Sequence, residues 1–92
     1  MSAQPSLPPR LRVLAVDDER PALEDLARLL EASPIVDQVT LAAGSAEALR
    51  LLGEERFDVV FLDMRMPGLD GLALAGLLSQ FAEPPDLVFV SA

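Results

Sequence analysis

The chain alternates short apolar runs with segments of helical spacing. The predicted strands lie at Leu11 to Val16, Val39 to Ala42, Asp58 to Leu62 and Leu87 to Val90, and each is mostly apolar over the length of one strand. Helical patterns fill the stretches between them, which is the arrangement of βαβ units on a parallel sheet. The pattern therefore predicts an α/β fold with four strands and three helices.

The first predicted helix begins near Pro21, a residue suited to a first helical turn, and stops before Pro34. Its apolar positions recur at helical spacing along one face. These positions are Leu23, Leu26, Ala27 and Leu30. The spacing predicts that this face packs on the sheet.

The other two helices have recognisable starts. Ser45 is the expected N-cap of a helix from Ala46 to Glu55, and Asp70 is the expected cap of one from about Gly71 to Phe81. The side chains predicted to point inward are Ala48, Leu49 and Leu52 in the former and Leu74, Leu77 and Leu78 in the latter.

Composition limits the possible functions. Ninety-two residues allow one small domain, and the absence of cysteine and histidine excludes disulfides, thiolate metal sites and histidine acid–base chemistry. The net charge of −8 argues against direct binding of nucleic acid or an anionic membrane by this segment. No apolar run approaches the ~18 residues that span a bilayer. Residues 1–10 are proline-rich and predict a disordered tail rather than a signal peptide, so we expect a cytoplasmic protein.

Three aspartates follow predicted strands. Asp17 and Asp18 come directly after the first, and Asp63 ends the apolar run of the third. Because the carboxyl ends of parallel strands meet at one edge of a sheet, these carboxylates are expected to converge. Each alone has an ordinary reading as a turn or helix-entry carboxylate. Together they predict a Mg²⁺ site made of oxygen ligands, with an aspartate nucleophile for phosphoryl transfer.

Two further features stand near these aspartates. Ser91 follows the fourth predicted strand; alone it is an ordinary strand-ending hydroxyl, but it is also able to donate to a phosphoryl oxygen. The loop Met66-Pro67-Gly68-Leu69-Asp70-Gly71 has good turn chemistry in its own right and begins three residues after Asp63. The chain has neither a G-x-G-x-x-G motif nor a Walker A lysine, which argues against a nucleotide site.

These segments together resemble the receiver domain of bacterial two-component response regulators. The resemblance rests on Val13 to Glu19, on Phe61 to Gly71 and on Val88 to Ala92, and it extends from about Leu11 to the end of the chain. A finer similarity, in Phe81 to Pro85, is to regulators whose output is a LytTR-type DNA-binding domain.

The resemblance implies a role for each site residue. Asp63 would be the phosphoacceptor for a sensor histidine kinase, and Ser91 the switch hydroxyl. Asp18, Asp63 and the backbone carbonyl of Arg65 would ligate Mg²⁺ directly, while Asp17 would hold the ion through water. The implied function is that of a phosphoacceptor switch, not a turnover enzyme.

The resemblance also implies a flavodoxin-like (CheY-like), doubly wound parallel sheet that is incomplete. The strand order would be 2-1-3-4, and residues 11–92 would form the N-terminal part of a receiver without its last helix, strand and helix. The family's phosphate-binding lysine lies in that last part, and all seven basic residues here are arginines. We expect the chain to be a piece of a longer regulator, with a natural or engineered short chain as the alternative, and a missing C-terminal output domain is the candidate for binding DNA. We also expect the open edge of the fourth strand to favour self-association, with strand exchange as one route.

Two other functions remain open. A receiver-like scaffold that forms interactions without phosphorylation is the first, because the family's lysine is missing. A Mg²⁺-dependent phosphatase is the second, but such enzymes place another aspartate two residues after the nucleophile, where this chain has Arg65.

Overall fold

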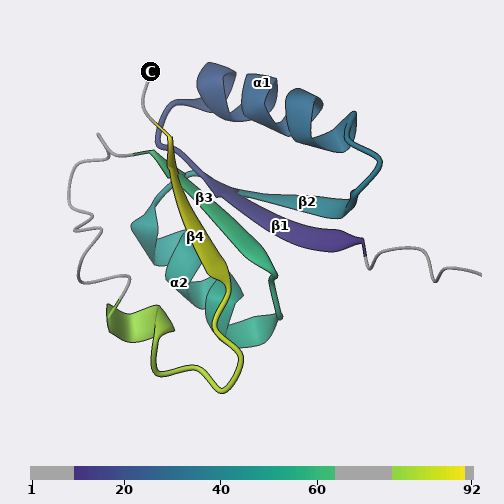
Figure 1. The fold of residues 1–92 in the computed structure, drawn as a ribbon. Helices are drawn as coiled ribbons and strands as arrows, with labels where there is room; N and C mark the ends of the chain where they lie inside the picture. The colour runs from purple at the N-terminus through teal and green to yellow at the C-terminus, as the bar shows by residue number, and fades with distance from the viewer. Residues whose placement is uncertain (1–9, 64–75, 91–92) are drawn as a thin grey trace, which may run out of the picture.

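A computed structural model describes residues 10–63 and 76–90. Their strands form one parallel sheet with the order β2-β1-β3-β4 (Figure 1). The predicted fold class and strand order are therefore confirmed. The elements are β1 Leu11–Val16, α1 Arg20–Glu31, β2 Val36–Ala42, α2 Ser45–Glu54, β3 Val59–Asp63 and β4 Asp86–Val90.

The centre of the sheet is the most deeply buried part of the described chain. β1 lies between β2 and β3, and its residues from Val13 to Val16 are each at most 1% exposed. Buried on both faces, such a strand reads as a continuous apolar run rather than an alternating one. This burial fixes β1, and with it the position of the residues that follow Val16.

Helices cover the sheet from both sides (Figure 1). α1 packs one face through Leu23 and Ala27, both buried. On the opposite face, α2 and the helical turn at residues 76–78 close over the larger core cluster. That cluster consists of Leu14, Val16, Ala42, Ala48, Leu51, Leu52, Phe57, Val60, Leu62 and Leu78. None of the helices among the described residues is both long enough and apolar enough to cross a membrane.

Strand bounds differ from the predictions at three places. β2 begins at Val36 rather than Val39, because pairing with β1 extends back to a buried valine that follows the turn after Pro34. β3 runs one residue later than predicted, at Val59–Asp63. Asp58, just before it, is bound to Arg12 twice: its backbone N–H donates to the carbonyl of Arg12 at 2.8 Å, and its side chain accepts a 2.8 Å hydrogen bond from the backbone N–H of Arg12. β4 begins one residue early, at Asp86.

The prediction for the second helix was wrong at its end, since α2 stops at Glu54 rather than Glu55, and in two further details. Ser45 is the first helical residue rather than the N-cap, which is Gly44, and no side chain caps this end. The carboxylate of Glu47 instead accepts a 3.4 Å hydrogen bond from the backbone N–H of Ala43. Leu49, predicted to point inward, is 45% exposed, and Leu51 is buried in its place.

The third predicted helix is described only in part. Residues 76–78 are helical, Leu78 is 3% exposed as expected, and Leu77 is 48% exposed, contrary to the prediction. Asp70, Gly71 and Leu74 lie outside the described residues, as do residues 1–9 of the predicted tail. Arg10, assigned to that tail, is described, and its guanidinium donates to the carbonyl of Val36 at 3.0 Å.

Candidate metal and phosphoryl-transfer site

The end of β1 holds the first two acidic residues of the site. The backbone N–H of Asp17 donates to the carbonyl of Ala42 at 3.2 Å, which continues the β1–β2 ladder one residue past β1. The backbone N–H of Glu19 then donates to Oδ1 of Asp17 at 2.9 Å, and α1 begins at Arg20. This local hydrogen bond fixes the half-buried Asp17 side chain at the strand–helix junction, while Asp18 is exposed.

β3 supplies the third acidic residue. Asp63 is its last residue. The register pairs Leu62 with Val16, so Asp63 and Asp17 are each the next residue after this pair and lie at the same level of the sheet. The side chain of Asp63 is half-buried. Parallel pairing thus joins carboxylates that are far apart in the sequence.

The three carboxylates form a compact cluster. Asp17, Asp18 and Asp63 each offer an oxygen, and these oxygens lie within 4.8 Å of one another. Burial raises the pKa of Asp17 above its ordinary value of 3.8, and the charges of Asp63, Asp18 and Glu19 raise it further, while the hydrogen bond from Glu19 lowers it. A divalent cation would relieve this repulsion, and a few carboxylate oxygens with room for water suit Mg²⁺.

The structure brings together only some of the predicted site residues. Asp17, Asp18 and Asp63 meet as expected. Arg65 and Ser91 lie outside the described residues, and their positions remain predictions. Val90, which pairs with Asp63 in the sheet, is the last described residue before Ser91.

One part of the site was not found from the sequence. A hollow of about 130 Å³ adjoins the acidic cluster, between the first turns of α1 and the ends of β3 and β4. Ala22, Leu26 and Val90 supply its apolar wall beside Asp17 and Asp63. Leu26 belonged to the predicted apolar face of α1. Helical spacing alone does not show that a residue of this face also lines the site.

A family model described as the response regulator receiver domain matches residues 13–92. The chain belongs to the response regulator receiver family. Members accept a phosphoryl group in two-component signal transduction, and this is the function class of the present receiver.

Relatives and solved structures agree with this assignment. The receiver is 42% identical over 85 residues to the positive alginate biosynthesis regulatory protein of Pseudomonas aeruginosa, and 42% identical over 82 residues to an uncharacterized response regulatory protein of Yersinia pestis. Each match covers 89% of this chain and 34% of the relative. The receiver therefore spans only about a third of the length of these relatives.

Two solved structures share both fold and sequence with the receiver. The response regulatory domain of protein MrkE from Klebsiella pneumoniae superposes with a TM-score of 0.77 at 34% identity, covering 89% of this chain and 67% of that one. Response regulator TrrA from Thermotoga maritima, solved in complex with Mg²⁺ and BeF, gives a TM-score of 0.76 at 30% identity and covers 89% and 70%.

Proposed function

We propose that Asp63 is the phosphoacceptor of this receiver and that it acts with Mg²⁺ bound by the acidic cluster. The observation that supports this proposal is the convergence of Asp17, Asp18 and Asp63 within 4.8 Å at the carboxyl ends of β1 and β3. Among the three we assign the nucleophile role to Asp63, the half-buried last residue of β3, as the resemblance to receiver domains implies.

The proposed reaction is a transfer between a phosphohistidine and a carboxylate. An oxygen of Asp63 forms a bond to phosphorus while the phosphorus–nitrogen bond of the donor breaks, and the released imidazole takes up a proton. Phosphoryl transfer depends mostly on positioning and on neutralising charge. Mg²⁺, when bound, supplies that neutralisation. Asp18, Asp63 and the carbonyl of Arg65 would hold the ion directly, and Asp17 would hold it through water.

The remaining roles rest on sequence alone. Ser91 would donate its hydroxyl to the phosphoryl group and so act as the switch residue. The partner would be a sensor histidine kinase in the cytoplasm. The relatives are much longer than this chain, so we assign DNA binding to a separate output domain, for which a LytTR-type module is our candidate. The receiver would be modified once per signalling cycle rather than act as a turnover enzyme.

Phosphorylation by a small-molecule donor tests the proposal. The purified chain should gain the mass of one phosphoryl group from phosphoramidate when Mg²⁺ is present and not when EDTA replaces it. The adduct should be cleaved by hydroxylamine, as an acyl phosphate is, and Asp63→Asn should abolish it. Asp25→Asn, a change on the exposed side of α1, is the matched control. An adduct of equal yield in Asp63→Asn would refute the assignment.

We also propose that the chain self-associates through the open edge of β4, as expected from the sequence. Within the described residues β4 pairs with β3 alone, and its Val88 and Phe89 are 39% and 44% exposed. Exposed apolar edge strands tend to pair with another chain. This feature also favours the alternative of an interaction scaffold that does not signal by phosphorylation.

Sedimentation velocity tests self-association through β4 and, together with the phosphorylation assay, distinguishes the phosphoacceptor from the scaffold. We expect a concentration-dependent dimer that Val88→Lys weakens at least tenfold, while Asp37→Lys on the opposite edge strand β2 leaves it unchanged. A monomer at all concentrations would overturn the edge proposal. A dimer in a chain that takes no phosphoryl group would favour the scaffold.

A further inference from the structure

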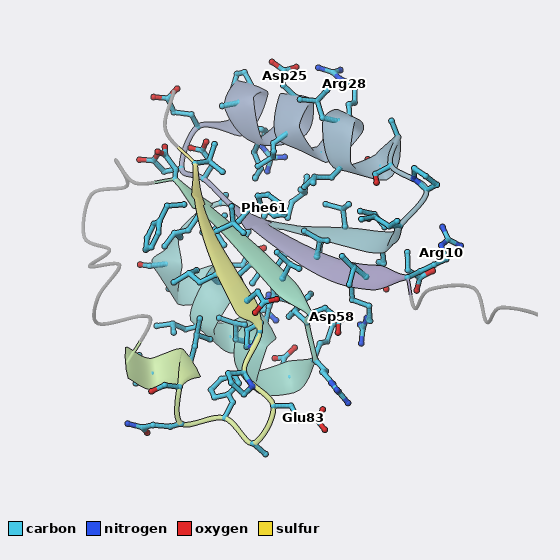
Figure 2. All side chains as sticks on the ribbon, in the orientation of Figure 1. Arg10, Asp25, Arg28, Asp58, Phe61 and Glu83 are labelled. Carbon is cyan, nitrogen blue, oxygen red and sulfur yellow. The ribbon has the colours of Figure 1, made fainter. Side chains whose placement is uncertain are left out.

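A second surface lies at the end of the sheet opposite the acidic cluster. Two adjoining hollows of about 490 and 310 Å³ open there and share Arg56, Phe57 and Glu83 as lining residues. They are formed by the end of α2, the connection into β3 and the loop that leads into β4. Figure 2 shows Glu83 and Asp58 at this end of the molecule. We call the two hollows together the basal groove.

The floor of the basal groove is apolar. Leu52 and Phe57 are 6% and 4% exposed, and they belong to the core cluster beneath the groove. Phe81 and Pro85 also line the groove, and Phe81 is 38% exposed. An aromatic ring left this open on a rigid floor is a ready contact for an apolar side chain of a partner.

The rim of the basal groove carries an excess of negative charge. The lining carboxylates are Glu54, Glu55, Asp58, Glu83 and Asp86. Three guanidinium groups stand against them: Arg56 pairs with Glu83, and from outside the lining Arg12 and Arg50 pair with Glu55 and Glu54. Five carboxylates against three guanidinium groups leave two negative charges in excess.

The Arg56–Glu83 pair is the adjustable part of the rim. Its side chains are 69% and 62% exposed, so opening the pair costs little. Arg12 is held more firmly, since its guanidinium lies 2.8 Å from Oε1 of Glu55 and 5.7 Å from the centre of the Phe57 ring. An incoming cation can therefore compete for Glu83 without disturbing the floor.

We infer that the basal groove docks a basic segment of a partner protein that carries apolar side chains between its arginines or lysines. The apolar side chains would rest on Phe81 and Pro85, above the buried Phe57, and the cations would meet Glu83 and Asp86. The excess negative charge disfavours nucleic acids and anionic membranes as occupants. The groove lies at the far end of the strands from Asp63, so this interaction is separate from phosphoryl transfer and does not rest on it.

A defined peptide pair tests this inference on the full chain. One capped hexapeptide alternates arginine with leucine and phenylalanine, and the other replaces each apolar residue with serine at the same charge. In amide NMR titrations the first should shift the signals of residues 53–57, 81–83 and 86. The serine peptide should bind at least tenfold more weakly.

Variants distinguish docking from unspecific attraction to an acidic protein. Phe81→Ser and Glu83→Gln change exposed positions, and each should weaken binding of the first peptide at least fivefold. The amide dispersion and the far-UV circular dichroism of both variants should be unchanged. Glu31→Gln, an exposed carboxylate at the end of α1, should have no effect. Equal binding of both peptides, or shifts centred on Asp17 and Asp18, would overturn the inference. So would shifts of the groove signals with protein concentration alone, which would make a second copy the occupant.

Discussion

Asp17 and Glu19 are linked by a local hydrogen bond, in which the backbone N–H of Glu19 donates to Oδ1 of Asp17 at 2.9 Å. This bond holds one carboxylate of the acidic cluster in place before any ion binds. It lowers the pKa of Asp17, but burial and the charges of Asp63 and Asp18 outweigh it, and the net effect is a raised pKa. The apo site is thus arranged for a cation at the expense of stability.

The first prediction concerns pH. A carboxyl whose pKa is higher in the folded than in the unfolded state destabilises the fold once both states are ionised. Asp17→Asn, which keeps an oxygen acceptor for Glu19, should therefore raise the melting temperature at neutral pH without Mg²⁺. The advantage should shrink as pH falls through the raised pKa of Asp17 and vanish below the ordinary value of 3.8. Thermal melts by circular dichroism across pH test this; Asp37→Asn is the remote control.

The second prediction concerns Mg²⁺. A ligand that binds only the folded state stabilises it by ~2.7 kcal/mol at a hundred times its Kd. Mg²⁺ should therefore raise the melting temperature of the wild type, and Asp18→Asn or Asp63→Asn should lose most of that rise. Sodium chloride at equal ionic strength is the control for screening. Equal shifts in the wild type and in both variants would show that the ion binds elsewhere.

The third prediction concerns Arg12, which joins β1 to the connection between α2 and β3. Its guanidinium pairs with Glu55 and lies over Phe57, and each of these partly exposed interactions contributes up to about 1 kcal/mol. Arg12→Ala should lower the free energy of unfolding by about 1–2 kcal/mol in urea titrations, since packing of the side-chain stem is lost as well. Arg12→Met should recover part of this loss. Arg28→Ala, at a pair about 70% exposed on α1, should change stability by less than about 0.5 kcal/mol.

The fourth prediction compares two leucines of α2. Leu52 is 6% exposed within the core cluster, and Leu49 is 45% exposed on the outer side. Leu52→Ala should cost about 2–5 kcal/mol by removing core contacts and leaving a cavity, while Leu49→Ala should stay within about 0.5 kcal/mol. Urea unfolding followed by far-UV circular dichroism measures both. A larger loss for Leu49→Ala would mean that α2 is rotated relative to the described orientation.

The sequence predicted the sheet well because its strongest signals are physical constraints on burial. The apolar run of Leu11 to Val16 has the bounds of β1, and the aspartates after β1 and within β3 meet because parallel strands end at one edge. The start of β2 was missed, since Asp37 and Gln38 on an exposed edge carry no apolar pattern. The strand forms there because its backbone pairs with β1, and the side chains of these residues give no sign of that pairing in the sequence.

The helices show where periodicity stops being informative. In α2 the leucines at 49, 51 and 52 allow more than one inward face, and packing into the core cluster selects Leu51 and Leu52. Ser45 has the usual chemistry of an N-cap, yet it is already helical, and Gly44, with φ of 174° and ψ of 169°, takes that position. The basal groove could not be predicted at all, since it joins residues 52–59 with residues 81–86 across the sheet.

The register of β1 against β3 has a consequence for how the cell would maintain this protein. The acidic cluster exists only when these strands are paired, so the unfolded chain has no comparable affinity for a divalent cation. If the cluster binds Mg²⁺ as proposed, the ion would add to the stability of the folded receiver in proportion to its occupancy. Proteolysis of the unfolded chain would then be slower when the site is filled, which links the site to the lifetime of the protein.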